Sequence, residues 1–467
     1  MSLLLFTMYS QAQNRGPSLT AIISEIEGYS SFDRSEHPLG VYKESLAKKD
    51  AEFALKQLAI LNRLDKNKLS ETELISCELL RFQLQNQVNE YEYKMYLNPI
   101  QADQGFHLNL NYRITPILSY DDAKQYLKML GAIPDFVDEH IILLKKGLKE
   151  GVSQPKIIFK GYQSTYDTHI VNDYSQSSFY GPLQQLPEVI NKVQQDSITV
   201  AAQKIIMDKV VPSFKKIKTF FETDYIPNTR NAIGVSETPN GLEFYQNRIN
   251  YYTTTTEYSA DDIHTIGISE VARIKSEMNA IIEEVNFEGS FSEFLTFLRT
   301  DSQFYAKTGD ELLMNARDAI APKYTGGRYS GPSSETQPGY YLVNTFKLES
   351  RPLYTLPSLT AHEAVPGHHL QGSLNKELGD SIPNFRRNMY LSAYGEGWAL
   401  YTEFLGNELG IYRTPYEEFG KLTYEMWRAC RLVVDTGIHA KGWSRDDVID
   451  YMMGNTALSE HEINTET

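Results

Sequence analysis

The segment His362-Glu363-Ala364-Val365-Pro366-Gly367-His368-His369 holds three of the ten histidines of the chain. Zinc in hydrolases is held by three protein ligands, usually imidazole nitrogens and a carboxylate, and keeps one position open for water. When the pattern His-Glu-x-x-His lies on a helix, both imidazoles face the ion and the glutamate acts as general base. We therefore predict a zinc-dependent hydrolase with His362 as a ligand and Glu363 as the base.

The spacing of the histidines departs from that pattern. His362 and His368 are six residues apart, so a regular helix, turning about 100° per residue, would point them to different sides. His369 would return to the first face, but about 10 Å along the axis, too far to share one ion. Because proline removes a helix hydrogen bond and glycine tolerates unusual dihedral angles, Pro366 and Gly367 allow the helix to bulge. We predict His368 as the second ligand; His369 is the alternative and otherwise lies beside the ligands or in the substrate cleft.

A third ligand is expected on a predicted helix further along the chain. Glu396 lies 28 residues beyond His368 in the segment Tyr394-Gly395-Glu396-Gly397-Trp398-Ala399-Leu400-Tyr401-Thr402-Glu403. Glu396 and Glu403 are seven residues apart and therefore share a helix face. We predict Glu396 as the metal ligand and Glu403 as a carboxylate that orients a ligand histidine. Without the histidine cluster, both would equally well be solvated acids on a helix surface.

A histidine and a strand are expected to complete the site. His439 follows Gly437, which we expect to stop a helix, and a hydrolase needs a donor for the oxyanion of its tetrahedral intermediate. We predict His439 as that donor, with a structural histidine as the equal alternative. Residues 340–345 predict a strand. Three of its side chains are expected either to line the cleft, where a substrate backbone adds to the strand, or to pack within the sheet: Tyr340, Tyr341 and Asn344.

The rest of the chain is predicted to be largely helical. Apolar residues recur at helical spacing in most of the sequence outside residues 324–356. A Tyr- and Thr-rich stretch, residues 241–256, predicts an extended segment instead. The predicted fold class is mainly α, a large helical fold with a small β-sheet beside the active-site cleft, in one domain over residues 19–467. The predicted helices cover residues 134–151, 187–223, 261–285, 389–409, 415–437 and 444–453.

Composition excludes several classes of protein. The 467 residues are 41% hydrophobic and carry a net charge of -15, so the chain is globular and repels nucleic acid. Cys77 and Cys430 offer neither a disulfide framework nor a zinc site. No apolar run reaches eighteen residues, so we expect no transmembrane segment. Residues 1–18 are interpreted as the remnant of an export signal or as a disordered N-terminus.

Four segments together carry a resemblance to a known family: Pro338-Gly339-Tyr340-Tyr341 with Asn344-Thr345, His362 to Gln371, Glu396-Gly397-Trp398-Ala399, and Asp435-Thr436-Gly437-Ile438-His439 with Gly442-Trp443. In these segments the sequence resembles a bacterial family known as domain of unknown function 885, whose members are often described as predicted lipoproteins or as metallopeptidase-like. Weaker similarity at residues 120–130 and 251–267 extends the resemblance over nearly the whole chain.

The resemblance implies a two-lobed helical fold with a deep channel, similar to the thimet-oligopeptidase and carboxypeptidase type of gluzincin. It implies His362, His368 and Glu396 as zinc ligands, with Glu363 as base. Family members usually continue past the position of residues 462–464 into a segment with a tyrosine near the cleft, whereas this sequence stops at Thr467. On that basis we expect this C-terminal segment to be missing and the activity to be affected.

These observations lead to three hypotheses about function. The first is a zinc metallopeptidase that acts on a peptide or small amide substrate. The alternatives are a catalytically silent, zinc-containing peptide-binding protein and a hydrolase of non-peptide amides or esters. The resemblance and the N-terminus together favour a periplasmic, secreted or lipid-anchored protein, and a cytoplasmic one otherwise.

Overall fold

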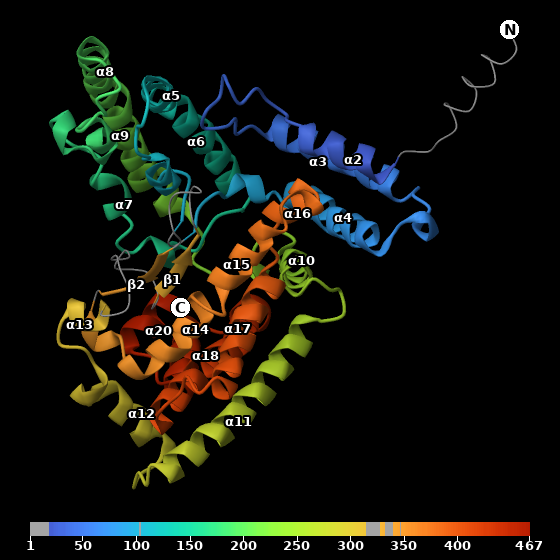
Figure 1. Ribbon diagram of the computed structural model, residues 1–467, viewed down its shortest axis with the longest axis vertical. Helices are drawn as coiled ribbons and strands as arrows, with labels where there is room; N and C mark the ends of the chain where they lie inside the picture. Colours follow the sequence, from blue (N-terminus) through green and yellow to red (C-terminus); the bar gives the residue numbers. More distant parts are fainter. Residues whose placement is uncertain (1–17, 102–103, 314–326, 332–339, 346) are drawn as a thin grey trace, which may run out of the picture. The chain divides into compact units, whose positions relative to one another are not determined.

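The computed structural model describes residues 18–101, 104–313, 327–331, 340–345 and 347–467. It divides into two compact units, Met1–Ile233 and Gly234–Thr467, both built mainly from helices (Figure 1). The strands of the described residues form one antiparallel pair, β1 (Gly327–Ser330) with β2 (Tyr340–Val343). The predicted mainly α fold with a small sheet is thereby confirmed. Residues 1–17 lie outside the described residues, as do Pro338 and Gly339 of the segments that carry the family resemblance.

The first unit is a helical bundle with an aromatic core. Its longest helical run covers residues 192–225, where π-helical turns follow α8 and α9. This run begins at Lys192, five residues later than predicted. The helices are α2 (Leu19–Gly28), α3 (Glu44–Leu61), α4 (Glu71–Glu92), α5 (Tyr120–Gly131), α6 (Ile133–Lys149), α7 (Ser164–Asp167), α8 (Lys192–Ile205) and α9 (Val211–Thr219).

Three histidines lie inside this core: His107, His140 and His169. The ring of His140 stacks on Phe106 with centroids 4.5 Å apart, and that of His169 lies 4.3 Å from Phe214. Burial lowers the pKa of His107 to about 3 and the pKa values of His140 and His169 to about 4. All three imidazoles are therefore neutral near pH 7.

The second unit is organised around two long helices that pack against each other, α11 (Ala260–Glu284) and α18 (Pro415–Lys441) (Figure 1). Ser259 and Asp262 form a capping box at the start of α11, which confirms the predicted beginning of that helix. The other helices are α10 (Gly241–Thr253), α12 (Phe291–Thr300), α13 (Gly309–Leu313), α14 (Leu356–Glu363), α15 (His368–Glu377), α16 (Asn384–Asn388), α17 (Ser392–Glu408), α19 (Arg445–Asn455) and α20 (Glu460–Glu466).

Two local predictions in this unit are wrong. Residues 241–256 were predicted to be extended, but Gly241 to Thr253 form helix α10, because Gly241, Tyr245 and Ile249 recur every four residues and are all buried. This spacing outweighs the Tyr and Thr composition. Gly437 was predicted to end a helix, but α18 continues to Lys441. Gly437 serves packing instead, since a Cβ there would lie 2.6 Å from the ring of Trp443.

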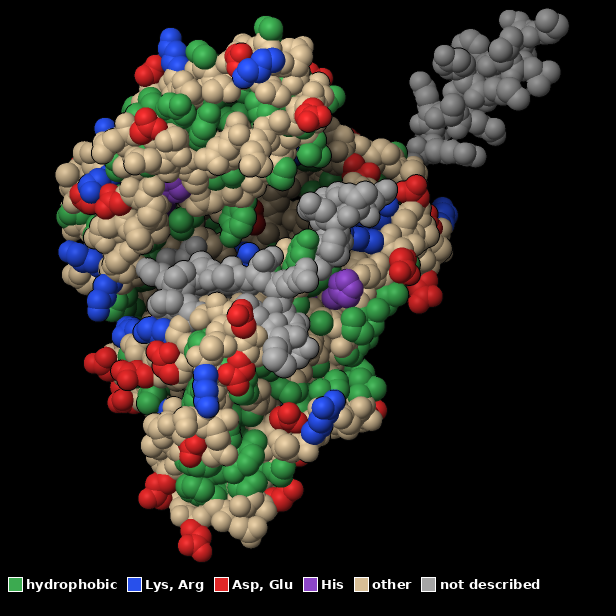
Figure 2. All heavy atoms as spheres, turned by 60° about the vertical axis from the view of Figure 1, so that its left-hand side comes forward, with side chains coloured by type: hydrophobic (Ala, Val, Ile, Leu, Met, Phe, Trp, Pro, Cys, Tyr) green, Lys and Arg blue, Asp and Glu red, His purple; other side chains and the backbone are tan. Residues whose placement is uncertain are grey.

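The surface carries both signs of charge. On the face drawn in Figure 2, Lys and Arg side chains alternate with Asp and Glu over the described residues and form no continuous basic patch. None of the described helices is long and apolar enough to span a lipid bilayer.

We expect the three buried histidines to make the first unit sensitive to acid. Unfolded histidine takes up a proton near pH 6.5, whereas these folded imidazoles do so only near pH 3 to 4. Their contribution to stability is therefore complete above about pH 6.5 and is lost as the pH falls toward about 4. Each histidine should lower the free energy of unfolding by up to about 1.4 kcal/mol per pH unit. Urea unfolding between about pH 7 and about pH 5 measures this loss.

The matched pair of variants is His107→Gln and His37→Gln, because His107 is buried and His37 is exposed in the same unit. Replacing His107 should reduce the pH dependence of the free energy of unfolding by about 1.4 kcal/mol per pH unit. Replacing His37 should leave it unchanged. Equal pH dependence in the two variants would contradict this account.

Candidate metal centre

The histidine motif is divided between two helices. Helix α14 ends at Glu363 and α15 begins at His368, with residues 364–367 as a turn between them. The expected bulge within one helix is thus a complete break. The break lets His362 and His368 face each other, and their ring centroids lie 4.8 Å apart with the ring planes nearly perpendicular.

The turn is fixed by Gly367 and by a tryptophan of α17. A Cβ on Gly367 would lie 1.8 Å from the carbonyl oxygen of His362, so only glycine fits. The indole Nε1 of Trp398 donates a hydrogen bond of 2.9 Å to the carbonyl oxygen of Pro366. Helix α17 therefore holds the turn that separates the two histidines.

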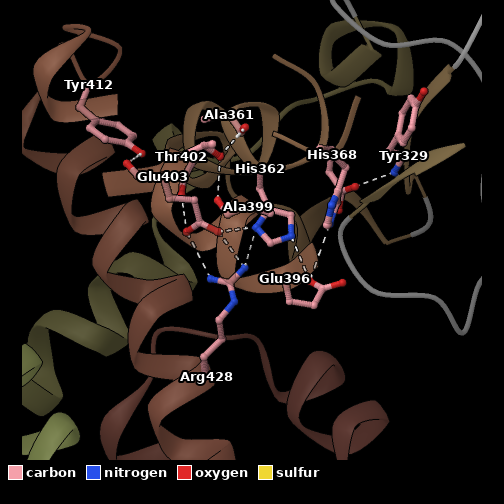
Figure 3. Close-up of polar contacts among 12 residues, drawn as sticks. Tyr329, Ala361, His362, His368, Glu396, Ala399, Thr402, Glu403, Tyr412 and Arg428 are labelled. Carbon is pink, nitrogen blue, oxygen red and sulfur yellow. Dashed lines mark hydrogen bonds and ion pairs between the residues drawn. The ribbon is translucent and has the colours of Figure 1, made fainter. Parts of the chain in front are cut away.

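Glu396 of α17 completes a cluster of three metal-ligating side chains (Figure 3). Its Oε2 lies 3.4 Å from Nε2 of His362 and 3.7 Å from Nε2 of His368. One ligand atom from each of the three residues lies within 4.8 Å of the others. The structure thus brings together the three residues predicted as ligands.

The other nitrogen of His362 is held by Glu403, as Figure 3 shows. Its Nδ1 lies 2.7 Å from Oε1 of Glu403 and 3.1 Å from Nη2 of Arg428; since a carboxylate can only accept, a hydrogen bond to Glu403 requires the proton on Nδ1. Ser358, one turn before His362 on α14, donates to Oε2 of Glu403 at 3.0 Å. Arg428 of α18 pairs with the same carboxylate, with Nη2 2.7 Å from Oε1 and Nη1 3.2 Å from Oε2.

This arrangement fits a bound cation. When His362 is neutral with its proton on Nδ1, the lone pair on its Nε2 and the oxygen of Glu396 are two acceptors with no donor between them, so a proton or a cation must lie there. A zinc ion about 2.0–2.1 Å from its ligand atoms would set them about 3.4 Å apart in a tetrahedron. The two observed separations from Glu396, 3.4 and 3.7 Å, are close to that value. A carboxylate behind a ligand histidine is the usual support of a zinc ligand, and Glu403 lies in that position behind His362.

The electrostatics of the cluster also favour positive charge. Hydrogen bonds from His362 and His368 hold the pKa of Glu396 well below its usual range. Burial opposes protonation of His362, but the carboxylates of Glu396 and Glu403 outweigh it and raise its pKa to about 9. The position between these side chains therefore attracts a proton or a metal ion.

Glu363 lies beside the cluster and is 8% exposed. Its Oε2 accepts a hydrogen bond of 2.6 Å from the backbone nitrogen of Tyr329 on β1. Burial raises the pKa of Glu363, although the nearby histidines oppose the shift. A carboxylate with a raised pKa next to a cation site has the properties of a general base.

The remaining predicted residues lie in different surroundings. Nδ1 of His369 lies 3.1 Å from the hydroxyl of Tyr329, outside the three-residue cluster. Of the predicted strand residues, Tyr340 is exposed, whereas Tyr341 is largely buried and Asn344 is fully buried.

His439 lies within α18 rather than after its end. Its Nδ1 accepts a hydrogen bond of 3.2 Å from the backbone nitrogen of Val235, and its Nε2 lies 3.7 Å from Asp435. Eleven residues separate it from Arg428, or about 16 Å along the helix axis. Its role as oxyanion donor stays a prediction.

Several residues of the centre were not predicted from the sequence. Tyr329 was missed because the four-residue strand β1 carries no alternating pattern. Ser358 had a usable signal, since it precedes His362 by one helical turn. Arg428 and Tyr390, whose hydroxyl bonds Glu396, had none.

Comparison with known proteins gives a family match and two similar solved structures. The model of the family described as "Bacterial protein of unknown function (DUF885)" matches residues 27–321 and 313–467. No curated protein matches the chain. A predicted lipoprotein from Colwellia psychrerythraea has a similar structure, with a TM-score of 0.81 and 23% identity over 96% of this chain and 84% of that one. A predicted lipoprotein of unknown function from Shewanella oneidensis gives a TM-score of 0.56 and 16% identity, covering 96% and 85%. Both likenesses concern the fold, and the family match shows that the chain belongs to the DUF885 family.

Proposed function

We propose that this protein is a zinc-dependent hydrolase of the gluzincin kind that cleaves peptides. The observation that supports this most is the group of potential ligand atoms on His362, His368 and Glu396, with the buried carboxylate of Glu363 beside it. Zinc held by these three side chains would polarise a water molecule and lower its pKa toward neutrality. The other steps, which are the proton transfers and the binding of the substrate, would be carried out by side chains and backbone groups of the protein.

Glu363 serves as the general base. The amide of Tyr329 fixes its Oε2, and its Oε1 has no hydrogen-bond partner in the part of the chain that the structure describes. That oxygen takes a proton from water as the water oxygen forms a bond to the carbonyl carbon. Glu363 then gives the proton to the leaving amine nitrogen as the carbon–nitrogen bond breaks. Burial raises the pKa of Glu363 and so makes it a better base.

The strand that lies beside Glu363 is β1. The backbone N–H of Tyr329 donates a hydrogen bond to Glu363 and not to β2. The edge of β1 on which this N–H lies therefore faces away from β2 and toward the site. The carbonyl group of a strand residue points to the same edge as its N–H. An extended substrate backbone therefore pairs with β1, which moves the predicted strand addition from Tyr340 and its neighbours to the opposite strand. This geometry favours peptides over small esters.

We also propose that the protein works outside the cytoplasm. The two similar structures described above are those of predicted lipoproteins. Fractionation of cells that produce the natural protein, followed by antibody detection in the envelope and cytoplasm, tests this placement.

The variant Glu363→Gln should keep its zinc and lose activity. Glutamine has the shape of glutamate but accepts no proton, and loss of a general base lowers the rate by about 10²- to 10⁴-fold. Digestion of a peptide library by the zinc-loaded protein, followed by mass spectrometry, gives the rate, and metal analysis gives the zinc content. Equal hydrolysis by the variant and the parent would refute the role of Glu363. A parent that holds zinc and binds peptides without cleaving them would instead support a binding protein.

Replacing each adjacent histidine in turn distinguishes the ligand from its neighbour. His368→Ala removes an atom that faces Glu396 and should abolish stoichiometric zinc binding, whereas His369→Ala removes a partner of Tyr329 and should leave zinc bound. Zinc content after dialysis against a chelator at graded concentrations measures the difference. The assignment fails if His369→Ala loses zinc and His368→Ala keeps it.

A further inference from the structure

Glu396 has a third partner besides the two histidines. The hydroxyl of Tyr390 donates a hydrogen bond of 2.8 Å to its Oε1, whereas Oε2 faces His362 and His368. The two oxygens of one carboxylate thus have different partners. Glu396 has no further hydrogen bond or ion pair in the described residues.

The hydrogen bond from Tyr390 is important because Glu396 is the most exposed of the three residues in the cluster. Its side chain is 57% exposed, while those of His362 and His368 are 7% and 16% exposed. A long exposed side chain loses rotamer freedom when it is ordered. Without Tyr390, only the two histidines would define which carboxylate oxygen points into the cluster.

The chain leaves room for this contact at Gly395. A Cβ on Gly395 would lie 2.5 Å from Cε2, Cζ and the hydroxyl of Tyr390. The ring of Tyr390 therefore lies directly over the helix at the residue before Glu396. An alanine at this position would displace the far end of the tyrosine ring rather than the backbone.

Building on the proposed zinc site, we propose that Tyr390 is a positioning residue that restricts Glu396 to ligation through Oε2 alone. The hydroxyl occupies Oε1, so the carboxylate presents one oxygen to the cation and the fourth position stays open for water. Loss of the hydroxyl frees Oε1 to approach the same ion, which weakens the preference for a four-coordinate site.

The test compares Tyr390→Phe with Tyr394→Phe in the full chain. Tyr394 lies in the first turn of α17, is 67% exposed, and its ring has no hydrogen bond in the described part of the chain. Zinc affinity is measured by competition with a chromophoric chelator. Tyr390→Phe should raise the dissociation constant about tenfold, the lower end of the usual effect of losing a partner of a metal ligand. Tyr394→Phe should leave it unchanged.

Cobalt substitution gives a second measurement that does not depend on activity. Co²⁺ absorbs visible light strongly in four-coordinate sites and weakly at higher coordination numbers. Tyr390→Phe should therefore weaken the visible bands of the Co²⁺-loaded protein, and Tyr394→Phe should not. An unchanged zinc affinity together with an unchanged cobalt spectrum in Tyr390→Phe would overturn the proposal.

Gly395→Ala tests the same contact by another route. Alanine favours helix more than glycine does, so a weaker site cannot result from a weaker α17. The variant should lower zinc affinity as Tyr390→Phe does, because it displaces the ring. In a Tyr390→Ala background the same substitution should have no further effect, and an equal added loss there would count against a role for the ring.

Reference variants separate this inference from the proposed function. His362→Ala and Glu396→Ala should each abolish stoichiometric zinc binding. If they do, and Tyr390→Phe behaves as the parent, only the role of Tyr390 is refuted. If neither changes zinc binding, the zinc site itself is refuted.

Discussion

The centre depends on the buried carboxylate of Glu403. This group is 1% exposed, and ionised carboxylates are stable in such surroundings only when they are paired and hydrogen-bonded. Its partners come from two other helices: Ser358 and His362 from α14, and Arg428 from α18. Removing one partner of a buried ion pair typically costs about 3–5 kcal/mol. The buried carboxylate of Glu403 on α17 must keep its partners on α14 and α18. This requirement fixes how the three helices pack against one another and how the ring of His362 is oriented.

The two ends of the centre differ in their exposure to solvent. His362, Glu363 and Glu403 are buried, whereas the side chain of Glu396 is more than half exposed. In the proposed mechanism, the buried end would keep the ligand and base in fixed orientations, and the exposed end would let water and an extended substrate reach a bound ion. Rigid support behind an open coordination position is what metal-assisted hydrolysis requires.

Much of this centre could be predicted from the sequence because it depends on spacing. The spacing of seven residues from Glu396 to Glu403 places both on one face of α17, and both contact His362. The break at residues 364–367 follows from the chemistry of Pro366 and Gly367, although its full extent does not. Arg428 and β1 could not be predicted, since one depends on how α18 packs and the other on a strand too short for a pattern. Helix α10 was missed because composition was given more weight than a four-residue repeat.

The position of His362 between two glutamates of one helix also has a consequence for folding. Glu396 contacts Nε2 and Glu403 contacts Nδ1, so the imidazole ring spans two turns of α17. A shift of α17 by a single residue would move both carboxylates by about 1.5 Å along the axis and about 100° around it. Both contacts would then be lost together, and Arg428 would lose its counter-ion as well. The contacts of this ring therefore depend on the register of α17. A chain whose helices packed one residue out of place would not assemble the cluster of His362, His368 and Glu396, so any metal binding by this cluster would depend on correct assembly.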